Sequence, residues 1–490
     1  MSIYRRQFCT GVLGGLAGRL LALPARPKLL VWIVVEQFRP DYLDSATPQL
    51  SAGGFRRLIE KGACFPDCRH LASSFPASAL ATLATGAWPA QHGIVADSWY
   101  DPPAGKPIMA SDEALLATTL AAQVTGTSHT RVFVVSMGQS QAGLFAGTPD
   151  AHRYWMDDRG EFATLGDPAD WLVNYNSQKN SESARNAKWQ ALGAPADAPA
   201  LRTLNFSADR PWEFMALYKS SPFALGAQFD FAGELLAREH MGQANTLDCL
   251  CLLVGSSALL GYEAGARSPL MQQMTLHIDR RLEALLTQLS KVPGENAFNL
   301  VVTGAHGAPP EPSADSRKRM AVNGESVAQA VEKALLAAGS GRVEKYLYPF
   351  LYLDTRGFRD PEPLRVAAAR AALAHPAVAD YYTAGGASSA HDDFARRLRN
   401  SFHPTRSGDV MLSYRPEYVE EYGNGRGISY GSIYNYDIRV PLFFYGPQFR
   451  AGTFENAVES VDVAPTLARA LGVATPSSST GRVLAEALAE

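Results

Sequence analysis

Hydroxyl side chains gather in the stretch Ser73–Ile94, whose sequence is SSFPASALATLATGAWPAQHGI. The pattern predicts a turn, then a helix of small residues that stops at Thr85-Gly86. Pro76 suits the first helical position, where no N–H is needed, and Ser74 is placed to cap the helix. The apolar run Leu29–Val35 lies upstream and is typical of a strand buried on both faces. A buried strand that leads through a hydroxyl-bearing turn into a helix can position a nucleophile or bind an anion.

Several segments of the chain share their order and spacing with one known family. They are TLATGAWPAQHGI with Trp99–Asp101 after it, SPFALGAQFDFAGELLAREHMG (221–242), RSGDV (406–410), YDIRVPLFFYG (436–446) and DVAPTLARALG (462–472). Through them the chain resembles the alkaline phosphatase superfamily, and within it the type I phosphodiesterase/nucleotide pyrophosphatase group. It is most similar to the exported bacterial alkaline phosphatases of that group. The resemblance implies hydrolysis of phosphate esters at two divalent metal ions about 4 Å apart.

The resemblance also assigns site positions, and most of them carry unsuitable residues. The nucleophile, a Thr or Ser in the family, stands ten residues before Gly86, at Pro76. The metal ligands, Asp and His in the family, correspond to Glu36, Ala258, Tyr262, Ala305, His306 and Tyr430. The phosphate contacts, Asn, Lys and Arg in the family, correspond to Asp97, Gly138 and Ser140. Only His306 keeps the family's residue type, and Gly and Ser cannot neutralise a phosphate.

The polar residues that remain have structural interpretations beside the functional ones. His306 follows a buried strand, where a hydrogen-bonded core histidine is expected rather than a ligand. Glu36 is either a lone metal ligand or, the simpler expectation, part of an ion pair with Arg39 or another cation. Ser74 and Ser78 flank the nucleophile position, but use of Ser74 requires a shift of two residues, so capping is favoured. Two ligands fall short of the three or four that a zinc site requires.

Two function classes follow from these replacements. We expect a catalytically inactive pseudoenzyme that keeps the fold, needs no cofactor, and binds a small molecule or a protein in the former active-site cleft. Clustered carboxylates are costly without cations, so neutral replacements such as Ala258 and Ala305 relieve repulsion once the metals are lost. The alternative is a hydrolase of phosphate monoesters or diesters with a relocated or reduced zinc site.

Alternating strand and helix patterns predict an α/β fold: an alkaline-phosphatase-like three-layer sandwich around a mostly parallel sheet. Strands are expected at 29–35, 131–136, 247–254, 299–303, 346–353 and 440–444, and helices at 78–83, 230–239 and 270–289. The weakly patterned segment 150–221 is expected as an inserted cap, and 309–401 as a small α/β lobe. Both belong to one domain that covers residues 28–490.

The composition of the 490-residue chain is that of a large globular protein, with 46% hydrophobic residues. A net charge of −3 provides no electrostatic footprint for nucleic acid. Cys249 and Cys251 are expected as buried thiols, while Cys64 and Cys68 are close enough in sequence for a local disulfide. A zinc site of Cys64, Cys68 and His70 lacks a fourth ligand and is disfavoured.

The N-terminal 27 residues resemble a twin-arginine export signal. They contain Arg5-Arg6, a glycine-rich apolar segment and small residues around Ala22–Ala25. No other segment approaches the length of apolar sequence that a membrane-spanning helix needs. The sequence therefore predicts a periplasmic or secreted protein.

Overall fold

A computed structural model describes residues 27–126, 130–195, 197–309, 321–339, 341–416, 418–421 and 430–489. Its centre is a ten-stranded sheet in the order β19-β2-β18-β11-β1-β10-β5-β6-β7, with β20 also paired to β2. Strand β1 (Leu29–Val35) lies in the middle and runs parallel to β10 (Asp248–Val254) and β11 (Phe298–Gly304). Every residue of these three strands is buried, which explains why their sequences are continuous apolar runs.

The remaining strands extend this sheet on both sides. Strand β5 (Arg131–Ser136) continues the parallel order and is followed by β6 (His152–Met156). At the other side β18 (Arg439–Tyr445) is antiparallel to both β11 and β2 (Ala63–Arg69), and β2 pairs in parallel with the short strands at the edge. Short strands β7 (Phe162–Thr164), β19 (Gly452–Thr453) and β20 (Val458–Glu459) complete the edges. The prediction of a mostly parallel central sheet is confirmed.

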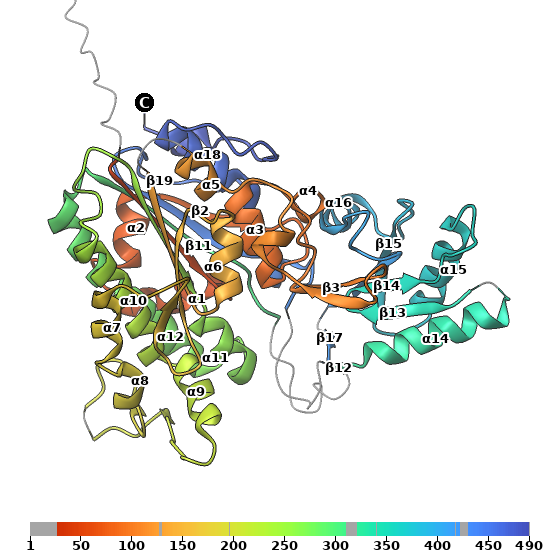
Figure 1. Ribbon diagram of the computed structural model, residues 1–490, viewed down its shortest axis with the longest axis horizontal. Helices are drawn as coiled ribbons and strands as arrows, with labels where there is room; N and C mark the ends of the chain where they lie inside the picture. The colour runs from red at the N-terminus through yellow and green to blue at the C-terminus, as the bar shows by residue number, and fades with distance from the viewer. Residues whose placement is uncertain are drawn as a thin grey trace, which may run out of the picture.

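Helices cover both faces of the sheet, which gives the expected three layers (Figure 1). Helices α3 (Pro76–Thr85), α5 (Leu120–Thr125), α6 (Gln139–Ala146) and α18 (Val463–Leu471) share one core with Leu30, Trp32 and Val34 of β1. Helices α1 (Pro40–Ala46), α2 (Phe55–Lys61), α10 (Pro222–Arg238) and α12 (Pro269–Leu289) share the opposite core with Leu29, Val31 and Ile33. The alternation along β1 therefore places successive side chains in different layers.

The segment expected as an inserted cap, 150–221, begins within the central sheet. Its first strands, β6 and β7, form one edge of that sheet, so the insertion starts only after β7. It then contains α7 (Asp170–Asn176), α8 (Asn180–Ser183), the pair β8 (Lys188–Trp189) and β9 (Arg202–Thr203), and α9 (Pro211–Lys219). The sequences of β6 and β7 mix polar and apolar residues. Sequence patterning alone therefore cannot distinguish these edge strands from an inserted segment.

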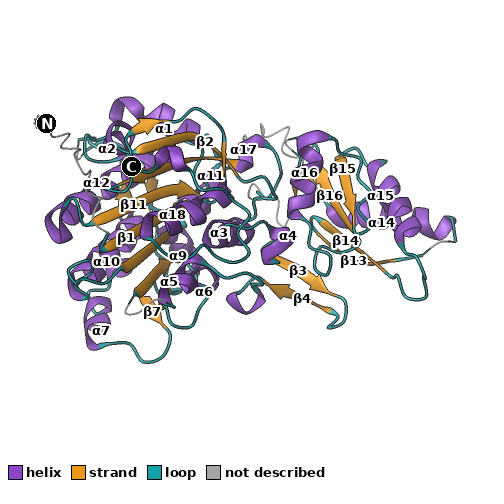
Figure 2. Cartoon of the chain, turned by 90° about the horizontal axis from the view of Figure 1, so that it is seen from above, coloured by secondary structure: helices purple, strands orange, loops and turns teal. Residues whose placement is uncertain are grey.

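The small lobe is a separate four-stranded antiparallel sheet, β13-β14-β16-β15, with helices α14 (Gly324–Ala337) and α15 (Glu362–Leu373) packed beside it (Figure 2). Its strand β16 (Val410–Tyr414) lies between β14 and β15 (Val378–Thr383), so the lobe extends beyond the expected limit of residue 401. The predicted strand 346–353 is a hairpin of β13 (Val343–Leu347) and β14 (Phe350–Leu353). Pro349 lies in the turn, where its missing N–H costs no ladder bond.

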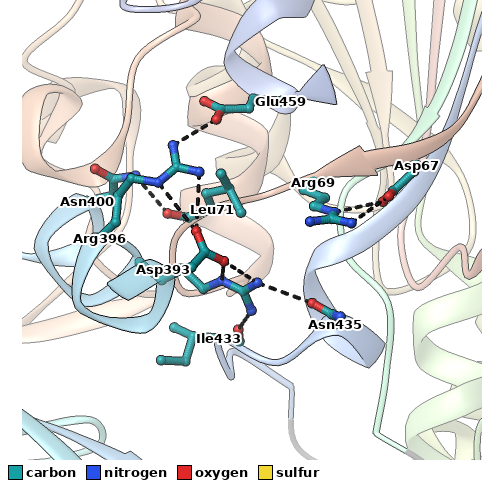
Figure 3. Close-up of polar contacts among 10 residues, drawn as sticks. Asp67, Arg69, Leu71, Asp393, Arg396, Asn400, Ile433, Asn435 and Glu459 are labelled. Carbon is teal, nitrogen blue, oxygen red and sulfur yellow. Dashed lines mark hydrogen bonds and ion pairs between the residues drawn. The ribbon is translucent and has the colours of Figure 1, made fainter. Parts of the chain in front are cut away.

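Helix α16 (Asp392–Ser401) attaches the lobe to the main body (Figure 3). Arg397 donates to the backbone oxygen of Ile433 at 2.6 Å and pairs with Asp393 at 2.6 Å. Arg396 pairs with Glu459 at 2.8 Å. Only the first of these arginines is buried, with 6% of its side chain exposed against 46% for Arg396.

A hairpin of β3 (Ser98–Asp101) and β4 (Lys106–Met109) reaches the lobe from the main body. The N–H of Tyr100 donates to the hydroxyl of Tyr352 in β14 at 3.1 Å. The guanidinium of Arg406 donates to the carbonyl oxygens of Gly93 and Ala114, both at 2.6 Å. These polar contacts fix the lobe as one wall of the cleft described next.

Candidate functional site

A cavity of about 570 Å³ opens at the carboxyl ends of β1, β5 and β10, where open α/β sheets usually bind ligands. Eight of the positions singled out in the sequence line it together: Glu36, Pro76, Asp97, Gly138, Ser140, Ala258, Tyr262 and Tyr430. They come from the end of β1, the start of α3, the loops beside β3 and β5, the first turn of α6, helix α11 (Ser256–Ala264) and the segment before α17 (Asn435–Ile438). Eight of the positions assigned through the resemblance therefore lie around one cavity.

Pro76 is the first residue of α3, as predicted, and Gly86 ends that helix in a left-handed conformation at φ 70°. The predicted cap is wrong. Ser74 donates its hydroxyl to the carbonyl oxygen of Ser432 at 3.1 Å, and the N–H of Ala77 instead donates to Oδ1 of Asp97 at 2.9 Å. A carboxylate thus occupies the helix N-terminus, where the aligned peptide dipoles favour negative charge.

Neither serine beside Pro76 is placed as a nucleophile. Ser74 and Ser78 are fully buried, and neither lines the cavity. The hydroxyl of Ser78 lies 3.0 Å from the carbonyl oxygens of Ser73 and Phe75 and donates toward the chain that leads into α3. Both hydroxyls are engaged in holding the turn.

Glu36 is 5% exposed and faces the cavity from the end of β1. Its Oε1 accepts a hydrogen bond from Nε2 of Gln141 at 2.6 Å. The expected pair with Arg39 is wrong, because that guanidinium binds Asp41 at 2.7 Å and the carbonyl oxygen of Ala308 at 2.7 Å. Arg39 points to the loop after β11, whereas Glu36 points to the helix after β5.

Burial raises the pKa of Glu36 to about 8, and the negative charge of Asp97 adds to that rise. Burial also raises the pKa of Asp97, to about 6, against the lowering effect of the Ala77 N–H. Asp97 therefore ionises first, at a pH where Glu36 is still neutral. At neutral pH the pair carries about one negative charge.

His306 is fully buried and lies behind the cavity wall. Its Nδ1 is 2.7 Å from the carbonyl oxygen of Gly307, and its ring lies 4.5 Å from the ring of Tyr430. Burial lowers the pKa of His306 to about 4, so the imidazole is neutral. Its Nε2 has no hydrogen-bond partner among the described residues. These contacts agree with the expected core histidine.

The donor set does not fit a two-metal centre. Proline, alanine and tyrosine occupy the positions that would supply most ligands, and only Glu36 and His306 retain ligand atoms. Across the part of the chain that the structure describes, no three His, Cys, Asp or Glu side chains lie together as a group that could hold a metal ion. The conceivable site of Cys64, Cys68 and His70 is likewise not assembled. Cys64 and Cys68 are free thiols of β2 that belong to opposite cores.

The other predicted thiols, Cys249 and Cys251, are buried in β10 and free, as expected. Burial raises the pKa of Cys251 to about 12 and that of Cys64 to about 11, so neither is a reactive thiolate at neutral pH.

A second cavity of about 270 Å³ adjoins the first and shares Asp97, Tyr262 and Tyr430 with it. Its other wall comes from the lobe, through Leu347 and Tyr348. The cleft is therefore built partly by the hairpin β13–β14, which is the element that sequence patterning merged into one strand.

Sequence reasoning missed several residues that line the larger cavity. They are Met109, Gln141, Lys219 and Leu259. Gln141 is adjacent to the recognised positions 138 and 140, so its neighbourhood was visible in the sequence. Lys219 comes from the end of α9 and pairs with Asp158 at 3.3 Å, and no local signal marks it as part of the site.

Comparisons with known proteins agree with this architecture. The model of the family described as type I phosphodiesterase / nucleotide pyrophosphatase matches residues 30–427. Alkaline phosphatase PhoV of Synechococcus elongatus is 25% identical over 95% of this chain and 93% of its own length. Alkaline phosphatase PafA of Elizabethkingia meningoseptica is 23% identical over 98% of this chain and 97% of its own.

Solved structures extend the likeness to the fold. The crystal structure of wild-type PafA matches with a TM-score of 0.84 at 20% identity and covers 95% of this chain and 99% of its own. Murine ectonucleotide pyrophosphatase / phosphodiesterase 5 matches with a TM-score of 0.59 at 14% identity, over 94% and 100% of the two chains. At these identities the structures establish the shared fold and nothing more.

Proposed function

Because this chain belongs to the type I phosphodiesterase / nucleotide pyrophosphatase family of the alkaline phosphatase superfamily, we propose that it is an exported, catalytically inactive member that binds a ligand in the former active-site cleft. One observation carries the proposal: Pro76 occupies the first position of α3 and has no atom that can attack phosphorus. Two of the relatives are alkaline phosphatases, and the resemblance places a hydroxyl nucleophile for such chemistry at the position that Pro76 occupies here.

The chemistry around Pro76 supports the same conclusion. The resemblance implies that two metal ions activate the hydroxyl nucleophile, and the described residues include no group of three ligands that could hold one. Gly138 and Ser140 line the cavity where cationic donors would hold a phosphate, and Asp97 adds a carboxylate there. Lys219 is the cation among the lining residues, and Asp158 already pairs with it.

A binding role is supported by the cavity itself. The cavity measures about 570 Å³, which falls in the range of small-molecule sites. A cavity of this kind is costly to keep in a core but is the ordinary shape of a ligand site. We propose that it binds without metal assistance and that the protein needs no zinc.

A second candidate, a hydrolase with a single zinc ion, is favoured by one observation. His306 keeps a buried Nε2 without a described partner, and Glu36 keeps a carboxylate that could provide another ligand. In that scheme Ser74 would have to turn away from the carbonyl oxygen of Ser432 and enter the cavity. That movement would break the hydrogen bond that holds the turn before α3.

Export is proposed from Arg5-Arg6 and the apolar segment after them, all of which lie outside the described residues. Within the described ranges, no helix combines the length and apolarity that crossing a bilayer requires. We propose a periplasmic or secreted location.

The test is metal content and turnover of the purified mature chain, with PafA prepared identically as the positive control. We expect zinc well below one equivalent, no change in melting temperature on addition of a chelator, and no hydrolysis of aryl phosphate monoesters or diesters above a no-protein blank. A metal bound far above its Kd would stabilise the fold by several kcal/mol, so its removal would be visible. Two zinc equivalents, or turnover that disappears in Ser74→Ala, would establish the hydrolase instead.

A further inference from the structure

The cleft has an acidic floor in place of a cationic one. Glu36 is 5% exposed, lines the cavity and has no cationic partner among the described residues. Asp97 lies close enough for its charge to affect Glu36, and it also lines both cavities. A buried carboxyl group without a counter-ion holds a proton or attracts a cation.

A polar side chain holds Glu36 in place beside Asp97. Gln141 lines the cavity and donates its Nε2 to Oε1 of Glu36 at 2.6 Å. The Oε1 of Gln141 is buried and has no hydrogen-bond partner among the described residues, so it lies behind the lining and is not open to a ligand. The acceptors that face the cavity are therefore those of the two carboxyl groups, and both suit an ammonium group.

The mouth of the cavity is apolar. Three of its lining side chains are exposed although they are large and hydrophobic: Met109 at 68%, Leu259 at 44% and Tyr262 at 37%. Exposed apolar side chains gathered at a cleft mark a binding surface more often than scattered ones do. A ligand that reaches the acidic floor would lay its apolar part on these three residues.

Aromatic rings complete the walls between mouth and floor. Tyr262 and Tyr430 line both cavities, and Phe75 and Tyr348 line the smaller one. Aromatic faces attract cations through their quadrupole and accept alkyl or aromatic groups equally well. The walls therefore tolerate either end of a ligand that is charged at one end and apolar at the other.

We propose that the cleft binds an organic amine, with its ammonium group on Glu36 and Asp97 and its apolar part against Met109, Leu259 and Tyr262. This inference rests on the proposed function, because it assigns a ligand class to the cleft of an inactive family member. The proposed ligand is a cation, whereas the resemblance implies an anionic phosphate ester as the substrate of this cleft. A phosphate would be repelled by the same carboxyl groups.

The test is isothermal titration calorimetry on the intact mature protein with three probes of similar shape: 2-phenylethylamine, 2-phenylethanol and phenyl phosphate. We expect the amine to bind at least about tenfold more tightly than the alcohol, the factor provided by one charge-assisted hydrogen bond. Phenyl phosphate should neither bind nor be hydrolysed.

Matched variants locate the effect. Glu36→Gln keeps the shape and a hydrogen-bonding side chain, and should remove the preference for the amine; Asp97→Asn should weaken it while still accepting from the Ala77 N–H. Glu234→Gln, which disturbs only a surface pair with Arg238, should bind as the parent does. A thermal melt of each variant checks that it is folded.

The outcomes separate the two proposals. Equal binding of amine and alcohol, or absence of amine binding, would overturn the amine assignment and leave the inactive-enzyme proposal standing. Binding or turnover of phenyl phosphate would overturn the inactive-enzyme proposal itself. Amine binding that persists unchanged in both folded carboxyl variants would place the ligand outside this cleft and refute the inference.

Discussion

Replacing Glu36 by glutamine should stabilise the protein in alkaline solution and have almost no effect in acid. The pKa of Glu36 rises from 4.5 to about 8 on folding, chiefly because the side chain is buried. Between these values the folded chain holds a proton that the unfolded chain has lost, so the free energy of unfolding falls as pH rises. At 1.36 kcal/mol per pH unit, the parent carries a cost of about 4 kcal/mol at pH 8 and under about 1 kcal/mol at pH 5.

Glutamine cannot ionise, so the variant avoids this cost while keeping a side chain that can bond to Gln141. For a chain of this length the entropy of unfolding is about 1 kcal/mol/K, and the melting temperature at pH 8 should rise by about 4 °C. Differential scanning fluorimetry from pH 4 to pH 9 measures the difference between variant and parent. The surface variant Glu234→Gln is the control and should track the parent at every pH.

The decisive quantity is the melting temperature of Glu36→Gln minus that of the parent, plotted against pH. Every other titrating group is present in both proteins, so its effect cancels in this difference. It should be near zero at pH 4, grow through neutrality and level off above pH 8. A flat curve would refute the reasoning, since it would mean that Glu36 ionises normally in the fold. A difference that shrinks with rising pH would mean that an unrecognised cation stabilises the ionised carboxylate.

Three further outcomes test other parts of the structure. Pro76→Thr alone should give no zinc-dependent turnover of an aryl phosphate, because the new hydroxyl lacks metal ligands; substantial turnover would show that the ligand positions are misplaced. Arg397→Met should lower stability by about 2 kcal/mol because it leaves the buried carbonyl oxygen of Ile433 unbonded, whereas Arg396→Met should cost under about 1 kcal/mol; equal melting temperatures would contradict this. Replacing Arg5-Arg6 by Lys-Lys should leave the precursor in the cytoplasm, and unchanged export would reject the twin-arginine assignment.

Much of the fold could be predicted from the sequence because the central strands are buried on both faces. Leu29–Val35 and Arg131–Ser136 match β1 and β5 residue for residue. The small-residue helix with Pro76 first and Gly86 after it was equally visible, since both residues have strict backbone preferences. The hairpin around Pro349 was not, because the end of β13, the two-residue turn and β14 form one apolar run, while the polar start of β13 lacks a strand signal.

The composition of the cleft was predicted from resemblance, but its hydrogen bonds were not. Glu36 and Gln141 are 105 residues apart in the chain, and no local pattern connects them. Asp97, and not Ser74, accepts the hydrogen bond from the first turn of α3, because the loop before β3 returns to that helix. Capping preferences describe only residues next to the helix in sequence, so they could not predict this acceptor. Lys219 lines the cavity because the inserted segment places the end of α9 there. The position of that segment relative to the sheet depends on tertiary packing, which no local sequence pattern describes.

The positions that the fold requires differ from those that phosphatase chemistry requires, and this chain separates them. Gly307 must remain glycine whatever the protein does, because a Cβ there would stand 2.0 Å from the carbonyl oxygen of Tyr436. Ala258 and Ala305 stand where metal donors would be needed, and without metals a carboxylate at either place would add an uncompensated charge to a buried site. Neutral residues such as Ala258 and Ala305 are therefore physically favoured there under the proposal of a protein that needs no zinc. Glu36 and Asp97 keep carboxyl groups in the same cavity, and the proposed cationic ligand would offset the cost of their charges.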